Sequence, residues 1–333
     1  MPNKKLKKNS MVWIIGLISS SIFGYLSFKS FRWAILRQIL LSVDAWSCIL
    51  AALCMLTSFN LRAYRWKFFL PQNRNFTFGS RLTGVALGYF FSNILPGRLG
   101  DLIRPGYLAK RNKEFYPVCL YSVVIERVWE LVIFVMLAFI FFKFSSLANL
   151  GPLRINFPFL IALILLGILF LIFVRSILRV FLTISKKLNL RSIARSINDV
   201  LNAFDGNLNF HDFVLSVLLT IIIFFLEGLF FVFLIDSLNI SINFLDSFLV
   251  MVITALSHSL PSAPANIGVF HYFCQLSLTR LGVDGEVALA AAIFIHAFMF
   301  IFDFIFAIVC ILFGPWRSRD FFEKLYLEEL ENA

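Results

Sequence analysis

The residues from Asn93 to Arg104 combine helix-breaking residues with groups that bind anions. Pro96 ends a helix, and Gly97 and Gly100 let the backbone approach a ligand closely. A helix that restarts after this break exposes N–H groups at its N-terminus, and these groups attract anions. We expect the Asp101 side chain to cap that second helix.

The same stretch contains two arginines whose planar guanidinium groups suit phosphate. Arg98 lies at the predicted break, and Arg104 follows one to two helical turns later. We therefore predict a site for the headgroup of a phospholipid or of a polyprenyl phosphate. Its expected residues are Asn93, Pro96, Gly97, Arg98, Gly100, Asp101 and Arg104. The alternative is a cytoplasmic loop whose arginines contact the bilayer surface.

Ionisable and polar side chains also occur inside or beside long apolar runs, where a charge is costly. A second stretch rich in proline, around residues 258–271, adds two histidines to this set. Each residue either takes part in coupling and transport or pairs structurally with another helix. The candidates are Glu126, Arg127, Glu227, His258, Asn266, His271, His296 and Asp303.

The sequence lacks several motifs that would indicate an enzyme. It has no G-x-x-x-x-G-K-[ST], H-E-x-x-H, G-x-S-x-G or G-x-G-x-x-G, and its five cysteines form no C-x-x-C. We predict no metal site and no cofactor. We also expect that this chain does not hydrolyse nucleotide through a P-loop.

The composition of the 333-residue chain predicts an integral membrane protein. Hydrophobic residues make up 60% and charged residues 15%, against about 45–50% and about 25% in soluble domains. This excludes a soluble enzyme, a disordered chain and a disulfide scaffold. The net charge of +11 comes from basic residues that flank apolar runs, so we attribute it to the positive-inside bias and not to nucleic-acid binding.

We predict a single all-helical, polytopic membrane domain over residues 1–333. Eight apolar segments approach the length of about 20 residues that crosses a bilayer. They are Met11–Phe28, Ser42–Leu61, Phe78–Leu95, Pro117–Phe142, Phe157–Val174, Phe213–Ile235, Phe244–Leu260 and Val287–Phe313, followed in the seventh case by a short stretch Ile267–Leu281.

Loop charges decide how these segments cross. If all eight segments cross, 14 Lys and Arg residues lie on the cytoplasmic side and 15 lie outside. If the third and seventh segments instead return to the side they entered from, 22 lie on the cytoplasmic side and 6 outside, as the positive-inside rule favours. We therefore predict about six full spans with hairpins at 84–104 and 244–281. Both hairpin tips contain S-x-x-L-P, which is compatible with an inverted repeat.

This topology places both termini in the cytoplasm and the protein in the cytoplasmic membrane. Residues 1–10 form a basic tail, 317–333 a C-terminal tail, and 186–208 an amphipathic helix on the cytoplasmic surface. Arg62 is expected in a cytoplasmic loop, outside the headgroup site.

Three motifs together resemble a known family. They are N-x-L-P-G-R-x-G-[DE]-x-x-R before a basic loop, E-R-x-x-[DE] early in the next span, and P-x-x-x-G-x-F late in the chain. The matching residues are Asn93, Leu95 to Asp101, Arg104, Glu126, Arg127, Glu130, Pro264, Gly268 and Phe270. This pattern is similar to the flippase-like membrane region of lysylphosphatidylglycerol synthases and of stand-alone relatives, including archaeal glycosylation-cluster proteins.

The resemblance implies lipid translocation and not lysyl transfer, because we expect no aminoacyl-transferring domain of the kind that full-length synthases have. Two residues depart from the family pattern: Asn266 follows Ala265 where a small residue is usual, and His271 stands where an acid is common. If that acid couples transport to protons, His271 puts the coupling in doubt.

We expect a non-enzymatic protein that flips an anionic phospholipid or a polyprenyl-phosphate-linked glycolipid between leaflets without ATP. The expected partners are that lipid and the bilayer, with a homo-oligomer or a biosynthetic complex as further possibilities. Two alternatives stay open: a membrane-embedded glycosyl- or phosphotransferase acting on a polyprenyl phosphate, and an accessory subunit of a lipid or polysaccharide assembly.

Overall fold

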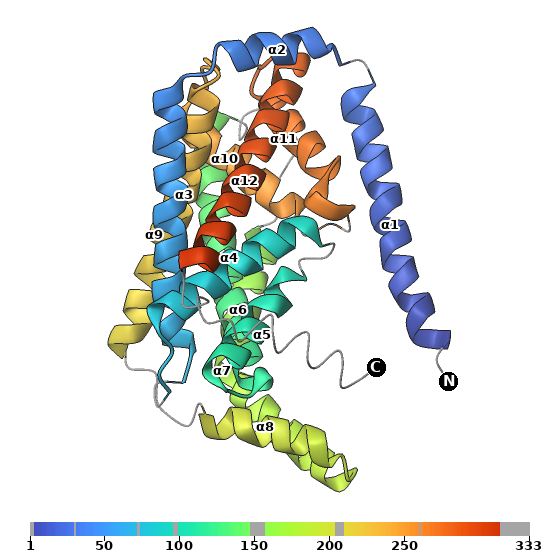
Figure 1. Ribbon diagram of the computed structural model, residues 1–333, viewed down its shortest axis with the longest axis vertical. Helices are drawn as coiled ribbons and strands as arrows, with labels where there is room; N and C mark the ends of the chain where they lie inside the picture. Colours follow the sequence, from blue (N-terminus) through green and yellow to red (C-terminus); the bar gives the residue numbers. More distant parts are fainter. Residues whose placement is uncertain are drawn as a thin grey trace.

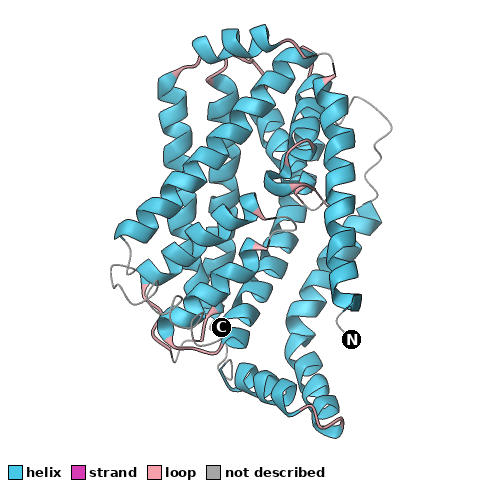
Figure 2. Cartoon of the chain, turned by 45° about the vertical axis from the view of Figure 1, so that its right-hand side comes forward, coloured by secondary structure: helices cyan, strands magenta, loops and turns pink. Residues whose placement is uncertain are grey.

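The computed structural model describes residues 3–29, 31–71, 74–95, 99–146, 157–203, 210–258, 260 and 262–313. Within these ranges every regular element is a helix (Figures 1 and 2). The helices are α1 (Asn3–Phe28), α2 (Trp33–Leu41), α3 (Ala45–Trp66), η1 (Lys67–Phe69), α4 (Phe78–Ile94), α5 (Gly100–Asn112), α6 (Tyr116–Phe144), α7 (Phe157–Lys187), α8 (Arg191–Ala203), α9 (Phe210–Asp236), α10 (Phe244–Ser257), η4 (Pro264–Asn266), α11 (Val269–Arg280) and α12 (Gly285–Phe313).

The long helices run along the molecule between two ends. Helix α2 lies across one end and α8 across the other, so we call these the α2 end and the α8 end (Figure 1). Among the described residues, three segments are long and apolar enough to cross a bilayer: α3 with η1, α9 and α12. Helices α6 and α7, with 29 and 31 residues, exceed the length that a bilayer core requires. The prediction of an all-helical membrane protein is confirmed.

Helices α3 and α9 lie side by side and run in opposite directions. Three hydrogen-bonded pairs define the register along their length, and they are Ser47–Asp236, Ser58–Glu227 and Arg65–Thr220. Asp44 caps α3 by accepting bonds from the backbone N–H groups of Ser47 and Trp46, and these bonds hold the pKa of Asp44 below its usual range. This pair forms one wall of the bundle (Figure 1).

Two pairs of shorter helices are broken inside the bundle. Helix α4 packs on α5, and α10 packs on α11. An ion pair of 3.4 Å between Arg74 and Glu114 joins the outer ends of the first pair at the α8 end. The break between α10 and α11 contains η4, which packs against α4. The irregular η4 segment therefore lies against α4 within the protein, where broken backbone at membrane depth is tolerated.

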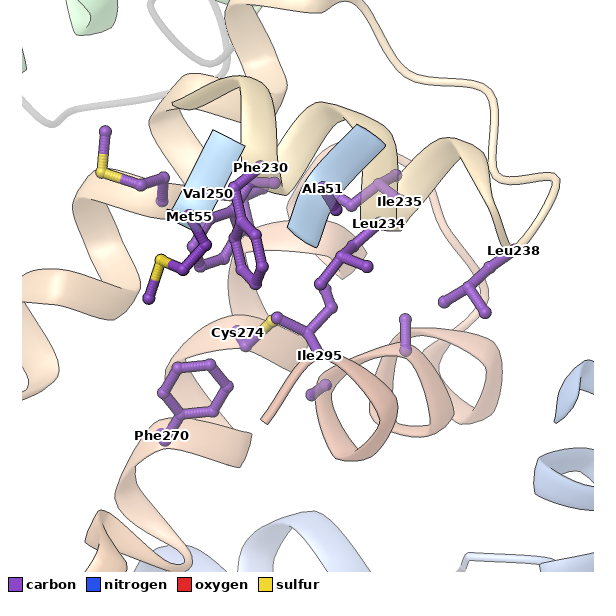
Figure 3. Packing of buried hydrophobic residues seen from close by; sticks show 14 of the residues in the cluster. Ala51, Met55, Phe230, Leu234, Ile235, Leu238, Val250, Phe270, Cys274 and Ile295 are labelled. Carbon is purple, nitrogen blue, oxygen red and sulfur yellow. The ribbon is translucent and has the colours of Figure 1, made fainter. Parts of the chain in front are cut away.

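A hydrophobic core fills the space between α3, α9, α10, α11 and α12. Figure 3 shows Met55, Phe230, Val250, Cys274 and Ile295 among its members. Small residues of α12, including Ala288 and Ala290 to Ala292, are fully buried in the same core. Such residues let helix backbones approach closely, which is how helices associate without a hydrophobic driving force in lipid.

Several sequence expectations need correction. Helix α3 continues to Trp66, so Arg62 is not a loop residue but a buried helical one. Helix α1 begins at Asn3, which makes most of the predicted basic tail helical. The short helix α2 was not predicted. Within 186–208, the amphipathic helix is α8, and residues 204–209 and 317–333 lie outside the described residues.

Helix α1 contacts the bundle through small residues at the break between α10 and α11. The backbone N–H of Ala263 donates to the Ser20 hydroxyl at 2.7 Å. Gly268 has a φ of +88°, and a Cβ atom there would collide with the backbone oxygen of Ser20. The α1 helix thus holds this break by a backbone approach that only glycine permits.

We predict that Gly268→Ala destabilises the protein more than Gly282→Ala. Both glycines have positive φ, which costs an alanine about 1–2 kcal/mol, but only Gly268 lacks space for a Cβ. Thermal unfolding of the detergent-purified variants measures the difference. Equal losses of stability would show that α1 does not hold the break.

Candidate functional site

Four arginines and four carboxylates form a buried ion network between α3, α5, α6 and α9. The arginines come from α3, α5 and α6, and the acids from α5, α6 and α9. The members are Arg62, Arg65, Asp101, Arg104, Glu126, Arg127, Glu130 and Glu227. Because each arginine carries +1 and each acid −1, the formal charges of the network cancel.

Glu130 is the centre of the network. It lies at the midpoint of the 29-residue helix α6 and is 6% exposed. One carboxylate oxygen accepts from both Arg62 and Arg65, and the other accepts from Arg127 at 2.5 Å. Arg62 also donates to Glu227 of α9, so the guanidinium group of this one α3 residue connects α6 with α9. Charge-assisted bonds of this kind are roughly twice as strong as neutral ones.

Glu126, one turn before Glu130 on α6, connects Arg65 to one further arginine, Arg104. Arg65 donates to its Oε1 at 2.7 Å, while Arg104 of α5 forms an ion pair of 2.8 Å with Oε2 that lacks hydrogen-bond alignment. The Arg104 guanidinium carbon lies 3.7 Å from the ring centroid of Trp66, within cation–π distance. Both Glu126 and Arg104 are shielded from solvent.

A cavity of about 370 Å³ opens beside the network and has a mixed lining. Its charged lining residues are two arginines and four acids: Arg62, Arg127, Asp101, Glu130, Glu227 and Asp303. Its apolar lining comes from the bundle helices and includes Met55, Leu131, Phe134, Phe224, Phe230, Phe231, Met251, Leu256, Phe270 and Met299. The volume falls within the range of about 300–1,000 Å³ that is usual for ligand pockets.

The two broken helix pairs meet at this cavity. Ser92 and Asn93 line it from the end of α4, and His258 lines it from just after α10. Asn93 donates to Oδ2 of Asp303 on α12 at 2.6 Å. The end of α4 and the residue that follows α10 therefore present polar groups to the same cavity.

The polar residues of the second break form their own group next to the cavity. Asn266 lies 3.1 Å from His258 Nδ1, and the backbone N–H of Gly268 donates to His271 at 3.3 Å. His271 and His296 approach to 3.4 Å between ring nitrogens. Of the groups named, only His258 lines the cavity. Among the residues that the structure describes, no three His, Cys, Asp or Glu side chains are grouped as metal ligands would be.

Of the predicted headgroup residues that the structure describes, Asn93 and Asp101 line the cavity, whereas Gly100 and Arg104 do not. Asp101 does not cap α5, whose N-cap is Leu99, and instead accepts from Arg127 at 2.8 Å. Arg104 does not line the cavity but points away toward Glu126 and Trp66. Gly100 packs against α4, where a Cβ would collide with the Gly88 backbone. Pro96, Gly97 and Arg98 lie outside the described residues.

The predicted intramembrane residues are brought together more closely than the headgroup residues. Arg127, Glu227, His258 and Asp303 all line the cavity, and Glu126 lies behind its wall. Sequence reasoning left three members out of the site: Arg62, Arg65 and Glu130. A signal was present, because Arg62 and Arg65 are three residues apart and Glu126 and Glu130 are four apart, so each pair lies on one helical face.

The chain is similar in sequence to a protein family and to an archaeal membrane protein. The family model described as "Lysylphosphatidylglycerol synthase TM region" matches residues 13–307 of the chain. The chain is also similar to UPF0104 membrane protein MJ1078 of Methanocaldococcus jannaschii, with 27% identity over 207 residues. That match covers 61% of this chain and 85% of the archaeal protein.

We predict that Glu126→Gln destabilises the protein by about 3–5 kcal/mol, because Arg104 is left buried without a counterion. The matched control is Glu286→Gln, which breaks the exposed pair with Arg32 and should cost less than about 1 kcal/mol. Thermal or denaturant unfolding in detergent gives both values. Similar small losses in the two variants would mean that the network contributes little to stability.

Proposed function

Because this chain belongs to the lysylphosphatidylglycerol synthase TM region family, we propose that it moves an anionic lipid between the leaflets of the cytoplasmic membrane. The observation that carries this proposal is the cavity whose lining includes both guanidinium groups and apolar side chains. A molecule that suits such a lining has an anionic headgroup joined to hydrocarbon. A phospholipid and a polyprenyl-phosphate-linked glycolipid both meet this requirement.

Arg127 is the cavity arginine best placed to contact the headgroup. Arg62 and Arg127 are each held by two carboxylates, but the side chain of Arg127 is 28% exposed and that of Arg62 is only 5% exposed. Arg104 is enclosed by Glu126 and Trp66, so we assign it a structural role. A phosphate that enters the cavity would compete with Asp101 and Glu130 for the Arg127 fork.

Access for a lipid from the side of the protein is supported by two leucines of the cavity lining. Leu131 of α6 and Leu256 of α10 are about half exposed, at 50% and 51%, although both contribute to the cavity wall. We propose that the lipid headgroup reaches the cavity from the lipid-facing surface near these two helices. A headgroup can enter while its acyl or prenyl chain stays in the bilayer.

Transport fits the cavity better than group transfer. A glycosyl- or phosphotransferase of this kind is expected to present a cluster of unpaired carboxylates that hold a metal or act as a base. Three of the four cavity carboxylates, Asp101, Glu130 and Glu227, are instead neutralised by arginines. We therefore favour a non-enzymatic role in which the chain binds its lipid and uses no nucleotide.

We predict that Arg127→Ala lowers leaflet exchange of a labelled phosphatidylglycerol ten- to hundred-fold in proteoliposomes. This range corresponds to the loss of a charged hydrogen bond, about 1.5–3 kcal/mol. Arg127→Lys should recover only part of the activity, because an ammonium lacks the planar fork. Arg32→Ala, an exposed arginine outside the cavity, serves as the control and should exchange lipid normally.

A double variant separates lipid contact from ion pairing. Arg127→Gln with Asp101→Asn removes the pair without changing the net charge of the cavity. If Arg127 contacts the lipid, the double variant stays as slow as Arg127→Ala. Full recovery of exchange in the double variant would contradict the assignment.

We also propose about six full spans with two re-entrant hairpins, and the α8 end in the cytoplasm. Support comes from the basic residues at that end, which follow the positive-inside rule. They include Arg74, Lys110, Arg111, Lys113, Lys186, Lys187, Arg191 and Arg195. With this orientation the first hairpin enters from the cytoplasm and the second from outside.

Single cysteines in a background without native cysteines test this topology. Asn75→Cys and Arg111→Cys should both be protected from an impermeant thiol reagent on whole cells, because they flank the first hairpin. Gln38→Cys, on the exposed surface of α2, should be labelled. If Arg111→Cys is labelled while Asn75→Cys is protected, the two sites lie on opposite sides of the membrane. The segment between them would then cross the bilayer fully, which contradicts the hairpin.

A further inference from the structure

Asp303 differs from every other acid of the cavity. Asp101, Glu130 and Glu227 each pair with at least one arginine, whereas Asp303 has no cationic partner among the described residues. Its Oδ2 accepts from Asn93 at 2.6 Å, and its Oδ1 is buried without any partner. The residue is 2% exposed, on the membrane-spanning helix α12. A buried carboxylate without a counterion is costly to keep ionised.

The groups that face Asp303 come from each helix around the cavity. Helix α9 supplies Glu227, which repels the ionised carboxylate. The remaining ionisable groups of the cavity are Arg62 of α3, Tyr89 of α4, Asp101 of α5, Arg127 and Glu130 of α6, and His258 after α10. His296, which is on α12 like Asp303, faces His271 of α11, and neither histidine lines the cavity. Helix α2 packs on α12 at the opposite end and carries Arg37 as its ionisable residue.

Asp303 therefore sets the net charge of the site. The four arginines and four acids of the network cancel, so the site carries −1 when Asp303 is ionised and 0 when Asp303 is protonated. An anionic headgroup is repelled by the first state. In the second state the headgroup meets a neutral site and a new hydrogen-bond donor, because protonation of Oδ1 creates an O–H group.

We infer that Asp303 is a proton-binding site and that the protein takes up one proton together with each anionic charge of its lipid. This inference rests on the proposed function. A proton from water adds to Oδ1 of the ionised carboxylate, and the resulting O–H donates to an oxygen of the lipid phosphate. After the headgroup leaves on the other side, the proton leaves Oδ1 to water. The lipid anion and the proton move together, so the step transfers no net charge.

Leaflet exchange of labelled phosphatidylglycerol at different pH values tests the inference. The probe is a phosphodiester, whose charge does not change between pH 5 and 8. Exchange by the parent protein should be fast at low pH, where Asp303 is protonated. It should fall about ten-fold per pH unit once Asp303 is mostly ionised.

Asp303→Asn mimics the protonated carboxyl, so it should exchange lipid rapidly at all pH values and lose the response to a pH gradient. Glu286→Gln is the matched control, since it replaces a carboxylate of the same helix outside the cavity, and it should keep the pH dependence of the parent. Unchanged pH dependence in Asp303→Asn would overturn the inference, as would a parent whose exchange does not vary with pH.

Proton uptake gives a second readout that does not depend on translocation or on the folding of a variant. The detergent-purified parent protein, in weakly buffered solution near neutral pH, should take up about one proton per bound phosphatidylglycerol. No uptake on binding would overturn the proton site while leaving lipid transport intact. Absence of exchange at every pH, with normal proton uptake, would instead contradict translocation and leave the proton site standing.

Discussion

The structure depends on the neutralisation of buried charge. A charged side chain at the centre of a membrane helix costs about 2.5–3.5 kcal/mol even on the mildest scale. This chain places several there, and it offsets the cost by directing guanidinium groups of α3, α5 and α6 at carboxylates of α5, α6 and α9. The positions of these four helices follow from that requirement, since each pair of charges is satisfied only when its two helices pack together.

The broken helices use the same principle for the backbone. A helix interrupted at membrane depth exposes N–H and C=O groups, which are tolerated only against protein or a polar cavity. Here the ends of α4 and α10 converge on the cavity, and α1 holds the second break through Ser20. The charge network and the two breaks therefore create a polar space inside an otherwise apolar bundle. A lipid headgroup needs such a space to cross the bilayer core.

The sequence predicted the class of fold and part of the site. Long apolar runs identified the helices, and Glu126, Arg127, Glu227 and Asp303 drew attention because a charge inside such a run is costly. Arg62 was misplaced because it follows directly after an apolar run, where arginine usually marks a loop. Which arginine pairs with which carboxylate of another helix depends on tertiary packing that no local pattern encodes. The same holds for the direction of Arg104, which points toward Glu126 and Trp66 and not into the cavity. Asp101 was predicted as a helix cap, but the nearby Arg127 is a stronger partner for its carboxylate.

The central claim is that an anionic lipid headgroup occupies the cavity beside Arg127. The most direct measurement is photocrosslinking with a phosphatidylglycerol that carries its reactive group on the headgroup, followed by peptide mapping of the purified protein. The account predicts crosslinks to cavity residues such as Tyr89, Ser92 and Thr254, and their loss in competition with unlabelled anionic lipid. Crosslinks confined to outward-facing residues such as Leu165 and Leu166 of α7 would contradict it.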